Sequence, residues 1–255
     1  MSKLIFAKKS LGQNFLQNKH YLRIIAEAGK LEKGDLILEV GPGTGNLTEY
    51  LLASGAKVLA IEKDHRMMDV LTTRFAKEIK SGALILENKD ILSIEPPKEE
   101  YKVIGNIPYY ITGQIIRRFL SHKNQPKTVV FLLQKEVATR ILARDGKESL
   151  LSLGVKAYGA PKIIATVAAG NFVPKPKVDS AILAIENISH QYFNHDRKAE
   201  QRFFEILKKG FAQKRKLLRS NLELEEGILG KYGLPEKIRA EDLKLEEWLK
   251  LANNI

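Results

Sequence analysis

The chain has 255 residues and no cysteine, and its lysines and arginines outnumber its acidic residues by 42 to 30, for a formal net charge of +12. This length allows one α/β domain and a smaller second domain. The absence of cysteine excludes disulfides, thiolate metal ligands and cysteine nucleophiles. The excess of positive charge indicates a polyanionic partner such as a nucleic acid, and a basic surface without any such partner is the alternative.

The apolar segments are too short for a membrane or secreted protein. The opening run, Met1–Phe6, is shorter than a secretory signal requires, and nowhere do about twenty apolar residues follow one another. The five histidines are scattered and show no metal-ligand spacing. We therefore expect a cytoplasmic, monomeric enzyme that uses neither a metal nor a membrane.

Short apolar runs alternate with stretches of helical period, which is typical of β-α-β units that build a parallel sheet. The predicted strands cover residues 35–40, 57–61, 83–86, 101–105, 127–133, 162–168 and 178–185. The predicted helices cover residues 46–53, 64–79, 112–121 and 135–143, with Asp64 and Thr112 as N-caps. The pattern predicts a Rossmann-like α/β domain with a seven-stranded, mostly parallel sheet.

The pattern changes after Ile185, where a polar stretch is followed only by helical periodicity. We predict a first domain of residues 1–187, which begins with an arm of residues 1–17, and a small helical domain of residues 188–255. A tail of about 65 residues is too small to hold a large core of its own, so we expect it to pack against the first domain.

The first predicted strand runs directly into a glycine turn, Gly41-Pro42-Gly43-Thr44-Gly45, and Asn46 then opens a helix. Such a turn lets a ligand approach the backbone. The dinucleotide fingerprint requires a small residue where Asn46 stands, so the spacing disfavours a pyrophosphate ligand. Taken alone, the turn is also compatible with a plain connection between a strand and a helix.

Acidic residues follow the second and third predicted strands. The carboxylate of Glu62 can accept hydrogen bonds from both hydroxyls of a ribose. Asp90 is placed to accept a hydrogen bond from an adenine amine, and Ile91 is available to pack on the ring. Together with the glycine turn, these residues predict a site for an adenosine-containing cofactor.

The fourth predicted strand ends in Asn106-Ile107-Pro108-Tyr109, at the sheet edge where ligands of open parallel sheets bind. The lone pair of an adenine amine is delocalised into the ring, so a catalyst has to favour the tetrahedral nitrogen. The side-chain oxygen of Asn106 and the carbonyl of Ile107, held by Pro108, can each accept one N–H bond and so turn the lone pair toward a methyl donor. Tyr109 offers a flat face for an extruded base. An ordinary turn is the alternative.

A second proline-stiffened turn, residues 171–180, carries one aromatic side chain, Phe172. Phe172 is a candidate to cover the other face of the base. The alternative is a rigid loop in which Phe172 is buried, and the sequence leaves both open.

These motifs resemble those of the KsgA/RsmA family of ribosomal RNA adenine N6,N6-dimethyltransferases over nearly the whole chain. Residues 8–16, KKSLGQNFL, resemble the family's N-terminal cofactor motif, and residues 39–45 resemble its glycine loop. Residues 106–109 and 172–180 match its catalytic and base-capping motifs. The resemblance implies S-adenosyl-L-methionine as cofactor, with a seven-stranded methyltransferase domain and a helical C-terminal domain. The cofactor contacts that it implies come from Asn14, Leu16, Gly41, Glu62, Asp90 and Asn106, assisted by Gln13. Gly43 and Gly45 of the glycine turn and Ile91 complete the predicted cofactor-binding residues.

The resemblance also implies the target: two adjacent adenines near the 3′ end of small-subunit ribosomal RNA, converted to N6,N6-dimethyladenine on the RNA or on an immature small subunit. Large-subunit enzymes of the macrolide-resistance type often carry Ile at the position of Ile107, where the small-subunit branch usually has Leu. Residues 11–13 and 178–181 look more like the small-subunit branch. We therefore expect the small-subunit target, with the large-subunit target as the alternative.

Basic residues crowd one part of the predicted C-terminal domain and could span phosphates across an RNA groove: Lys208, Lys209, Lys214, Arg215, Lys216 and Arg219. Lys8 and Lys9 extend this predicted surface. A solvated helix face is the simpler explanation of such a run. Other functions left open are a DNA adenine methyltransferase, a non-catalytic RNA-binding assembly factor and a nicotinamide oxidoreductase.

Overall fold

The computed structural model describes residues 13–108 and 111–255, and the chain divides into two compact units. The first extends to Ala138 and includes Lys162–Ile188; the second consists of Thr139–Pro161 and Ser189–Ile255. The sequence predicted a single boundary, after residue 187. The structure in addition assigns Thr139–Pro161 to the second unit.

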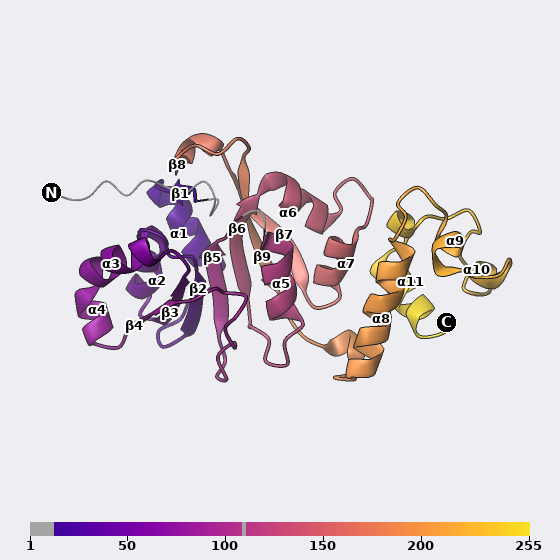
Figure 1. The fold of residues 1–255 in the computed structure, drawn as a ribbon, viewed down its shortest axis with the longest axis horizontal. Helices are drawn as coiled ribbons and strands as arrows, with labels where there is room; N and C mark the ends of the chain where they lie inside the picture. The colour runs from indigo at the N-terminus through magenta and orange to yellow at the C-terminus, as the bar shows by residue number, and fades with distance from the viewer. Residues whose placement is uncertain (1–12, 109–110) are drawn as a thin grey trace. The chain divides into compact units, whose positions relative to one another are not determined.

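The first unit is built on a seven-stranded sheet in the order β4-β3-β2-β5-β6-β9-β7 (Figure 1). Its strands are β2 (Leu36–Val40), β3 (Lys57–Glu62), β4 (Leu84–Asn88), β5 (Lys102–Asn106), β6 (Val129–Gln134), β7 (Ala160–Val167) and β9 (Ser180–Glu186). The strands from β4 to β6 pair in parallel, and β9 runs antiparallel to β6. This confirms the predicted fold class, and every predicted strand is present with small shifts at its ends.

Helices cover the sheet, and Figure 1 shows α5 (Thr112–Leu120) crossing in front of its strands. Residues 129–133 of β6 are all buried, as expected of a central strand covered on both faces. The remaining helices of this part of the chain are α1 (Lys19–Ala28), α2 (Asn46–Ala53), α3 (His65–Arg74), α4 (Ala76–Lys80) and α6 (Lys135–Leu142).

Two helix predictions need correction. The helix expected over residues 64–79 is split into α3 and α4, because Phe75 leaves the helical conformation (φ −113°, ψ 31°) and turns its ring toward Gly45. Asp64 caps α3 as predicted, accepting from the Arg66 amide at 3.2 Å. Thr112, by contrast, is not an N-cap. It is buried in the first turn of α5, and its hydroxyl donates to the carbonyl of Pro108 at 3.4 Å.

Three features escaped the sequence analysis. Helix α1 is capped by Asn18, whose side chain accepts from the His20 amide at 3.0 Å. A two-stranded sheet joins β1 (Phe15–Leu16) to β8 (Phe172–Val173) in antiparallel register. Helix α7 (Leu150–Lys156) begins at Ser149 with a capping box. β1 and β8 have two residues each, which is too short for a recognisable alternation of apolar and polar residues.

The second unit is helical: residues 189–255, all of which the structure describes, contain no strand. Its helices are α8 (Arg197–Gly210), α9 (Leu218–Leu222), α10 (Ile228–Lys231) and α11 (Leu245–Ala252), together with α7. Phe203, Leu207 and Trp248 are fully buried and form its centre. The Glu148 amide donates to the Glu241 carbonyl at 2.8 Å, which ties the inserted segment to the C-terminal residues.

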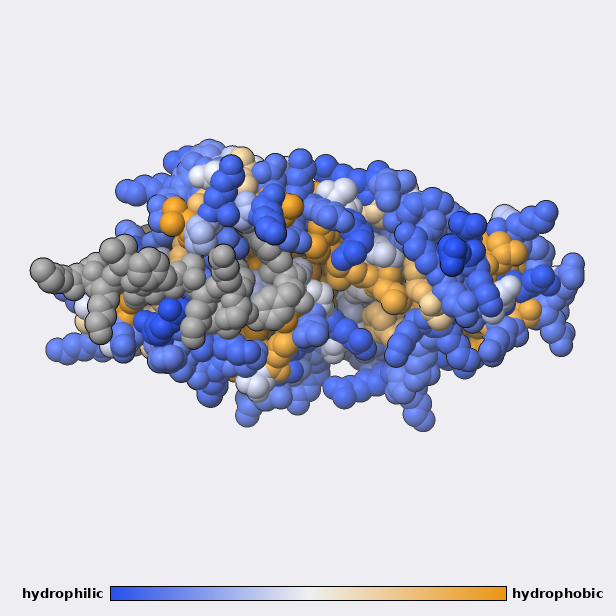
Figure 2. Space-filling view, turned by 45° about the horizontal axis from the view of Figure 1, so that its top comes forward, coloured by the Kyte–Doolittle hydropathy of each residue, from blue (hydrophilic) through white to orange (hydrophobic). Residues whose placement is uncertain are grey.

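Where residues are described, no helix has the length and apolarity needed to cross a bilayer. Hydrophilic residues cover most of the face shown in Figure 2.

Candidate active site

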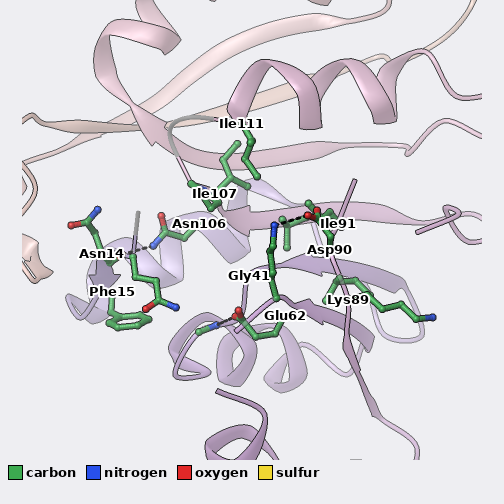
Figure 3. A pocket seen from close by; sticks show the side chains of 16 residues that line it. Asn14, Phe15, Gly41, Glu62, Lys89, Asp90, Ile91, Asn106, Ile107 and Ile111 are labelled. Atoms are coloured by element: carbon green, nitrogen blue, oxygen red, sulfur yellow. Dashed lines mark hydrogen bonds and ion pairs between the residues drawn. The ribbon is translucent and has the colours of Figure 1, made fainter. Parts of the chain in front are cut away.

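A cavity that is partly open to solvent lies in the first unit at the carboxyl ends of β2, β3, β4 and β5 (Figure 3). Ligands of open α/β sheets bind at this edge. Most of the predicted site residues line it: Gln13, Asn14, Gly41, Gly43, Glu62, Asp90, Ile91, Asn106, Ile107 and Pro108. Phe15, Lys63 and Lys89 also line it and were not predicted, although each is adjacent in sequence to a predicted residue.

The ends of β2 and β5 lie side by side, with Val40 paired to Gly105. A side chain at position 105 would collide with the carbonyl oxygen of Val40. Glycine at this position therefore allows the glycine turn after β2 and the Asn106 turn after β5 to open into one cavity. No pattern in the sequence predicted this role of Gly105.

Position 43 of the glycine turn requires glycine for two reasons. The backbone there has a φ of +57°, which side chains disfavour, and a Cβ atom would lie only 2.8 Å from the ring of Phe15. The Gly43 amide donates to Glu62 Oε2 at 3.0 Å. Gly45, which was predicted to contact the cofactor, does not line the cavity and instead packs beside Phe75.

Glu62 is almost fully buried, and the backbone fixes its carboxylate. Oε2 accepts from the Gly43 amide and Oε1 from the Asp64 amide, the latter at 2.8 Å. Burial raises the pKa of Glu62 above its usual value. Because each carboxylate oxygen has a second lone pair, the group can still accept hydrogen bonds from a ligand in the cavity.

A second carboxylate, Glu39, belongs to β2, just before the glycine turn, and is almost completely buried. Its Oε2 accepts from the Thr48 hydroxyl at 2.7 Å, while its Oε1 has no hydrogen-bond partner in the structure. Burial, reinforced by the charge of Glu62, raises the pKa of Glu39 to about 8. Ionisation of this group therefore opposes folding.

We expect a Glu39→Gln variant to show a shallower pH dependence of stability. A carboxyl whose pKa is raised in the folded state favours folding at low pH, and this contribution is lost as the pH rises through the folded pKa of about 8. The free energy of unfolding of the wild type should thus fall between roughly pH 5 and pH 9 more than that of the variant. Urea titrations across this range measure both slopes. Equal slopes would show that the pKa of Glu39 is the same in the folded and the unfolded state.

Asp90 stands at the cavity mouth with both carboxylate oxygens engaged. Its Oδ1 accepts from the Leu92 amide at 2.9 Å, and its Oδ2 accepts from the Lys63 ammonium at 2.7 Å. The hydrogen bond from Lys63 holds the pKa of Asp90 below its usual value. Within the described part of the chain, no three His, Cys, Asp or Glu side chains group together to hold a metal ion.

The arm of residues 13–16 is tied to the wall of the cavity. Gln13 Nε2 donates to Asp64 Oδ2 at 2.9 Å, and Asn46 Nδ2 donates to the Leu16 carbonyl at 3.1 Å. Leu16 itself is buried and lines a smaller adjoining cavity rather than the main one. Lys8 and Lys9 lie outside the described residues.

The turn after β5 orients the Asn106 side chain. Asn106 Nδ2 donates to the carbonyl of Asn14 at 2.8 Å, so Oδ1 is left as the acceptor end of the amide (Figure 3). The Ile107 amide donates to the Leu132 carbonyl at 3.2 Å, which anchors the turn to β6. Tyr109 lies outside the described residues.

Phe172 is not exposed toward a base. It is 2% exposed, belongs to the hydrophobic core and pairs with Leu16 through β8. The ring therefore lies in the buried position of the alternative, and contact of Phe172 with a base stays a prediction from the sequence. The reason is the pairing of β8 with β1, which points this side chain inward.

The chain matches the family model described as ribosomal RNA adenine dimethylase over residues 6–255. It belongs to this family. Its relatives among the ribosomal RNA adenine dimethylases include proteins named ribosomal RNA small subunit methyltransferase A. The one from Dehalococcoides mccartyi strain CBDB1 is 39% identical over 96% of this chain and 87% of the relative. The one from Lactobacillus acidophilus is 34% identical over 98% of this chain and 91% of the relative. The resemblance read from the motifs is confirmed.

Two solved structures of methyl-group transferases have a similar fold. A dimethyladenosine transferase from Plasmodium falciparum matches with a TM-score of 0.78 and 28% identity, over 93% of this chain and 95% of that one. The 23S rRNA methyltransferase ErmE matches with a TM-score of 0.76 and 25% identity, over 94% of this chain and 98% of that one.

Of the basic residues predicted to bind RNA, five are exposed on the second unit: Lys208, Lys209, Lys214, Arg215 and Lys216. Arg219 differs from them, because its side chain is only 33% exposed and lies near two carboxylates, 3.5 Å from Glu226 and 4.0 Å from Glu236. Arg219 is therefore less available to a phosphate than the other five.

Proposed function

We propose that this protein transfers methyl groups from S-adenosyl-L-methionine to two adjacent adenines near the 3′ end of small-subunit ribosomal RNA. Two transfers to each N6 atom give N6,N6-dimethyladenine. The observation that carries this proposal is the position of the Asn106 amide: it lies in the same cavity as the glycine turn and Glu62, with its nitrogen bonded to the Asn14 carbonyl.

The cavity suits an adenosine-containing sulfonium cofactor. Glu62 supplies a fixed, buried acceptor for ribose hydroxyls, Asp90 an acceptor for an exocyclic amine, and Ile91 an apolar wall for a ring. When bound, S-adenosyl-L-methionine supplies a methyl group that its sulfonium already makes electrophilic. Leu16 and Gly45 lie outside this cavity and are not part of the proposed contact set.

Asn106 and Ile107 would prepare the adenine amine for attack. The Asn14 carbonyl orients the Asn106 amide, so Asn106 Oδ1 can accept one N–H of the adenine amine. The carbonyl of Ile107 is the proposed second acceptor, and Pro108 restricts its rotation. Two acceptors localise the nitrogen lone pair. As N6 bonds to the methyl carbon, the bond from this carbon to the sulfonium sulfur would break and leave S-adenosylhomocysteine, and one N6 proton would then pass to water. Stacking of the base on Tyr109 stays a prediction from the sequence.

The small-subunit target rests on the relatives. Proteins that are 34% to 39% identical to this chain are named small-subunit methyltransferases, whereas ErmE, a 23S rRNA methyltransferase, is 25% identical. This difference favours the small-subunit target over the large-subunit alternative, despite Ile107. A monomer in the cytoplasm is the expected form of the enzyme.

The test incubates the protein and methyl-labelled S-adenosyl-L-methionine with four substrates in separate samples. These substrates are immature small subunits, bare small-subunit RNA, large-subunit RNA and adenine-containing DNA. Mass spectrometry of the digested products then maps the modified nucleotides. We expect dimethyladenine in the small-subunit samples at two adjacent positions. Label in the large-subunit RNA or the DNA alone would reject the proposed target, and no label in any sample would reject the activity.

We expect the exposed basic residues of the second unit to contact RNA phosphates. Replacing Lys214, Arg215 and Lys216 together by glutamine should weaken binding to a 3′ small-subunit RNA fragment. It should also flatten the dependence of log K on log salt, because each lost phosphate contact removes about 0.7–0.9 from the slope. Fluorescence anisotropy at several salt concentrations measures both quantities.

A matched control replaces Lys57, Lys77 and Lys80 by glutamine. These lysines are exposed residues of the first unit, and the change in net charge is the same. The control should leave the slope close to that of the wild type. Equal slopes for the two triple variants would remove the basic residues of the second unit from the interface.

A further inference from the structure

Lys63 and Asp90 form an ion pair at the mouth of the cavity. Lys63 follows the last residue of β3, and Asp90 follows β4, the parallel neighbour in which Asn88 pairs with Glu62. The two side chains therefore leave the same sheet edge next to each other. The ammonium of Lys63 lies 2.7 Å from Asp90 Oδ2, and both residues line the cavity together with Ile91.

This ion pair fixes the orientation of the carboxylate. Asp90 Oδ1 is held by the Leu92 amide and Oδ2 by Lys63, so the group cannot rotate without losing a charge-assisted hydrogen bond. The same contact keeps the pKa of Asp90 low, so the carboxyl stays ionised. An ionised carboxylate only accepts hydrogen bonds, whereas a protonated carboxyl can also donate one to a carbonyl.

We propose, on the basis of the cofactor assignment above, that Lys63 is a specificity-determining residue of the cofactor site. It holds Asp90 as a fixed acceptor, so the cavity selects a purine with an exocyclic amine over one with a carbonyl in that place. An amine meets the carboxylate as a donor. A carbonyl oxygen would face the negative charge with no proton between them. Lys63 acts through Asp90 and is a positioning residue, not a catalytic one.

Lys127 offers a matched control outside the cavity. Its ammonium pairs with Glu100 at 2.7 Å, the same distance as in the pair of Lys63 with Asp90, and its side chain is 61% exposed where that of Lys63 is 57% exposed. Lys127 does not line the cavity. Replacing either lysine by methionine removes one positive charge of similar exposure, but of the two ammonium groups only that of Lys63 pairs with Asp90.

The experiment measures the binding of two cofactor analogues by isothermal titration calorimetry. One is S-adenosylhomocysteine, and the other is S-inosylhomocysteine, in which a carbonyl replaces the purine amine. The wild type should prefer the adenine compound by roughly 10-fold or more, the usual value of a hydrogen bond to a charged group. In Lys63→Met the preference should fall by about 3- to 10-fold, mainly through weaker binding of the adenine compound, since the ion pair is partly exposed.

Lys63→Arg should restore the preference, and Lys127→Met should keep it. A Lys63→Met protein that bound the adenine compound as tightly as the wild type, or more tightly, would show that the ion pair merely covers the site, and would overturn the proposal. Equal weakening of both compounds would overturn it as well. A wild type that bound neither compound would instead reject the cofactor assignment, and the role of Lys63 with it.

Discussion

Asn106→Ala is expected to reduce methyl transfer by roughly 10²–10³-fold, the usual cost of removing one preorganised hydrogen-bonding group from a catalytic site. The affinity for S-adenosylhomocysteine should change little. The variant loses the proposed acceptor for the amine of the target adenine in the RNA. Glu62 and Asp90, the proposed contacts of the cofactor, remain in place. Single-turnover transfer to immature small subunits, with calorimetry for the cofactor analogue, separates the two effects.

Asn46→Ala is the control for the possibility that Asn106→Ala acts only by loosening the arm of residues 13–16. Asn106 and Asn46 each donate a side-chain hydrogen bond to an arm carbonyl, that of Asn14 and that of Leu16, at 2.8 Å and 3.1 Å. Asn46 does not line the main cavity. If the loss in Asn106→Ala came only from the arm, Asn46→Ala would lose turnover to the same degree. We expect Asn46→Ala to stay much closer to the wild type, and equal losses would contradict the two-acceptor mechanism.

Glu62→Gln is expected to weaken the binding of S-adenosylhomocysteine by roughly 10- to 100-fold, because hydrogen bonds to a charged group contribute about 1.5–3 kcal/mol. The amide of glutamine has one oxygen where the carboxylate has two, and both carboxylate oxygens already accept backbone N–H bonds. One of these bonds and the negative charge are lost together. Calorimetry measures the affinity, and far-UV circular dichroism checks the fold.

Glu49→Gln provides the same chemical change at a surface position. The Glu49 carboxylate is 63% exposed and pairs with Arg74 outside the cavity. Its replacement should leave the affinity for S-adenosylhomocysteine within about twofold, as is usual for an exposed ion pair. A Glu62→Gln protein that bound the analogue as well as Glu49→Gln would exclude Glu62 from the cofactor site.

The sequence predicted those site residues that have a polar side chain and stand at or just after the end of a predicted strand. Glu62 and Asn106 end the strands β3 and β5, and Asp90 comes two residues after the end of β4. Parallel strands bring their carboxyl ends to one edge of the sheet. Their convergence therefore needed no knowledge of side-chain packing. Leu16 and Gly45 stand in the N-terminal motif and the glycine turn, yet they lie outside the main cavity, because a motif specifies neighbours along the chain and not which of its residues border a cavity.

The sequence by itself determined the seven strands, the glycine turn and the polar residues that end β3 and β5, because these are encoded by local periodicity and turn chemistry. Only the tertiary structure decided the burial of Phe172, the ion pair of Lys63 with Asp90 and the hydrogen bond that orients Asn106. These depend on contacts between distant segments, such as Asn14 with Asn106 and β1 with β8. Such contacts follow from the packing of the whole unit, and no local pattern encodes them.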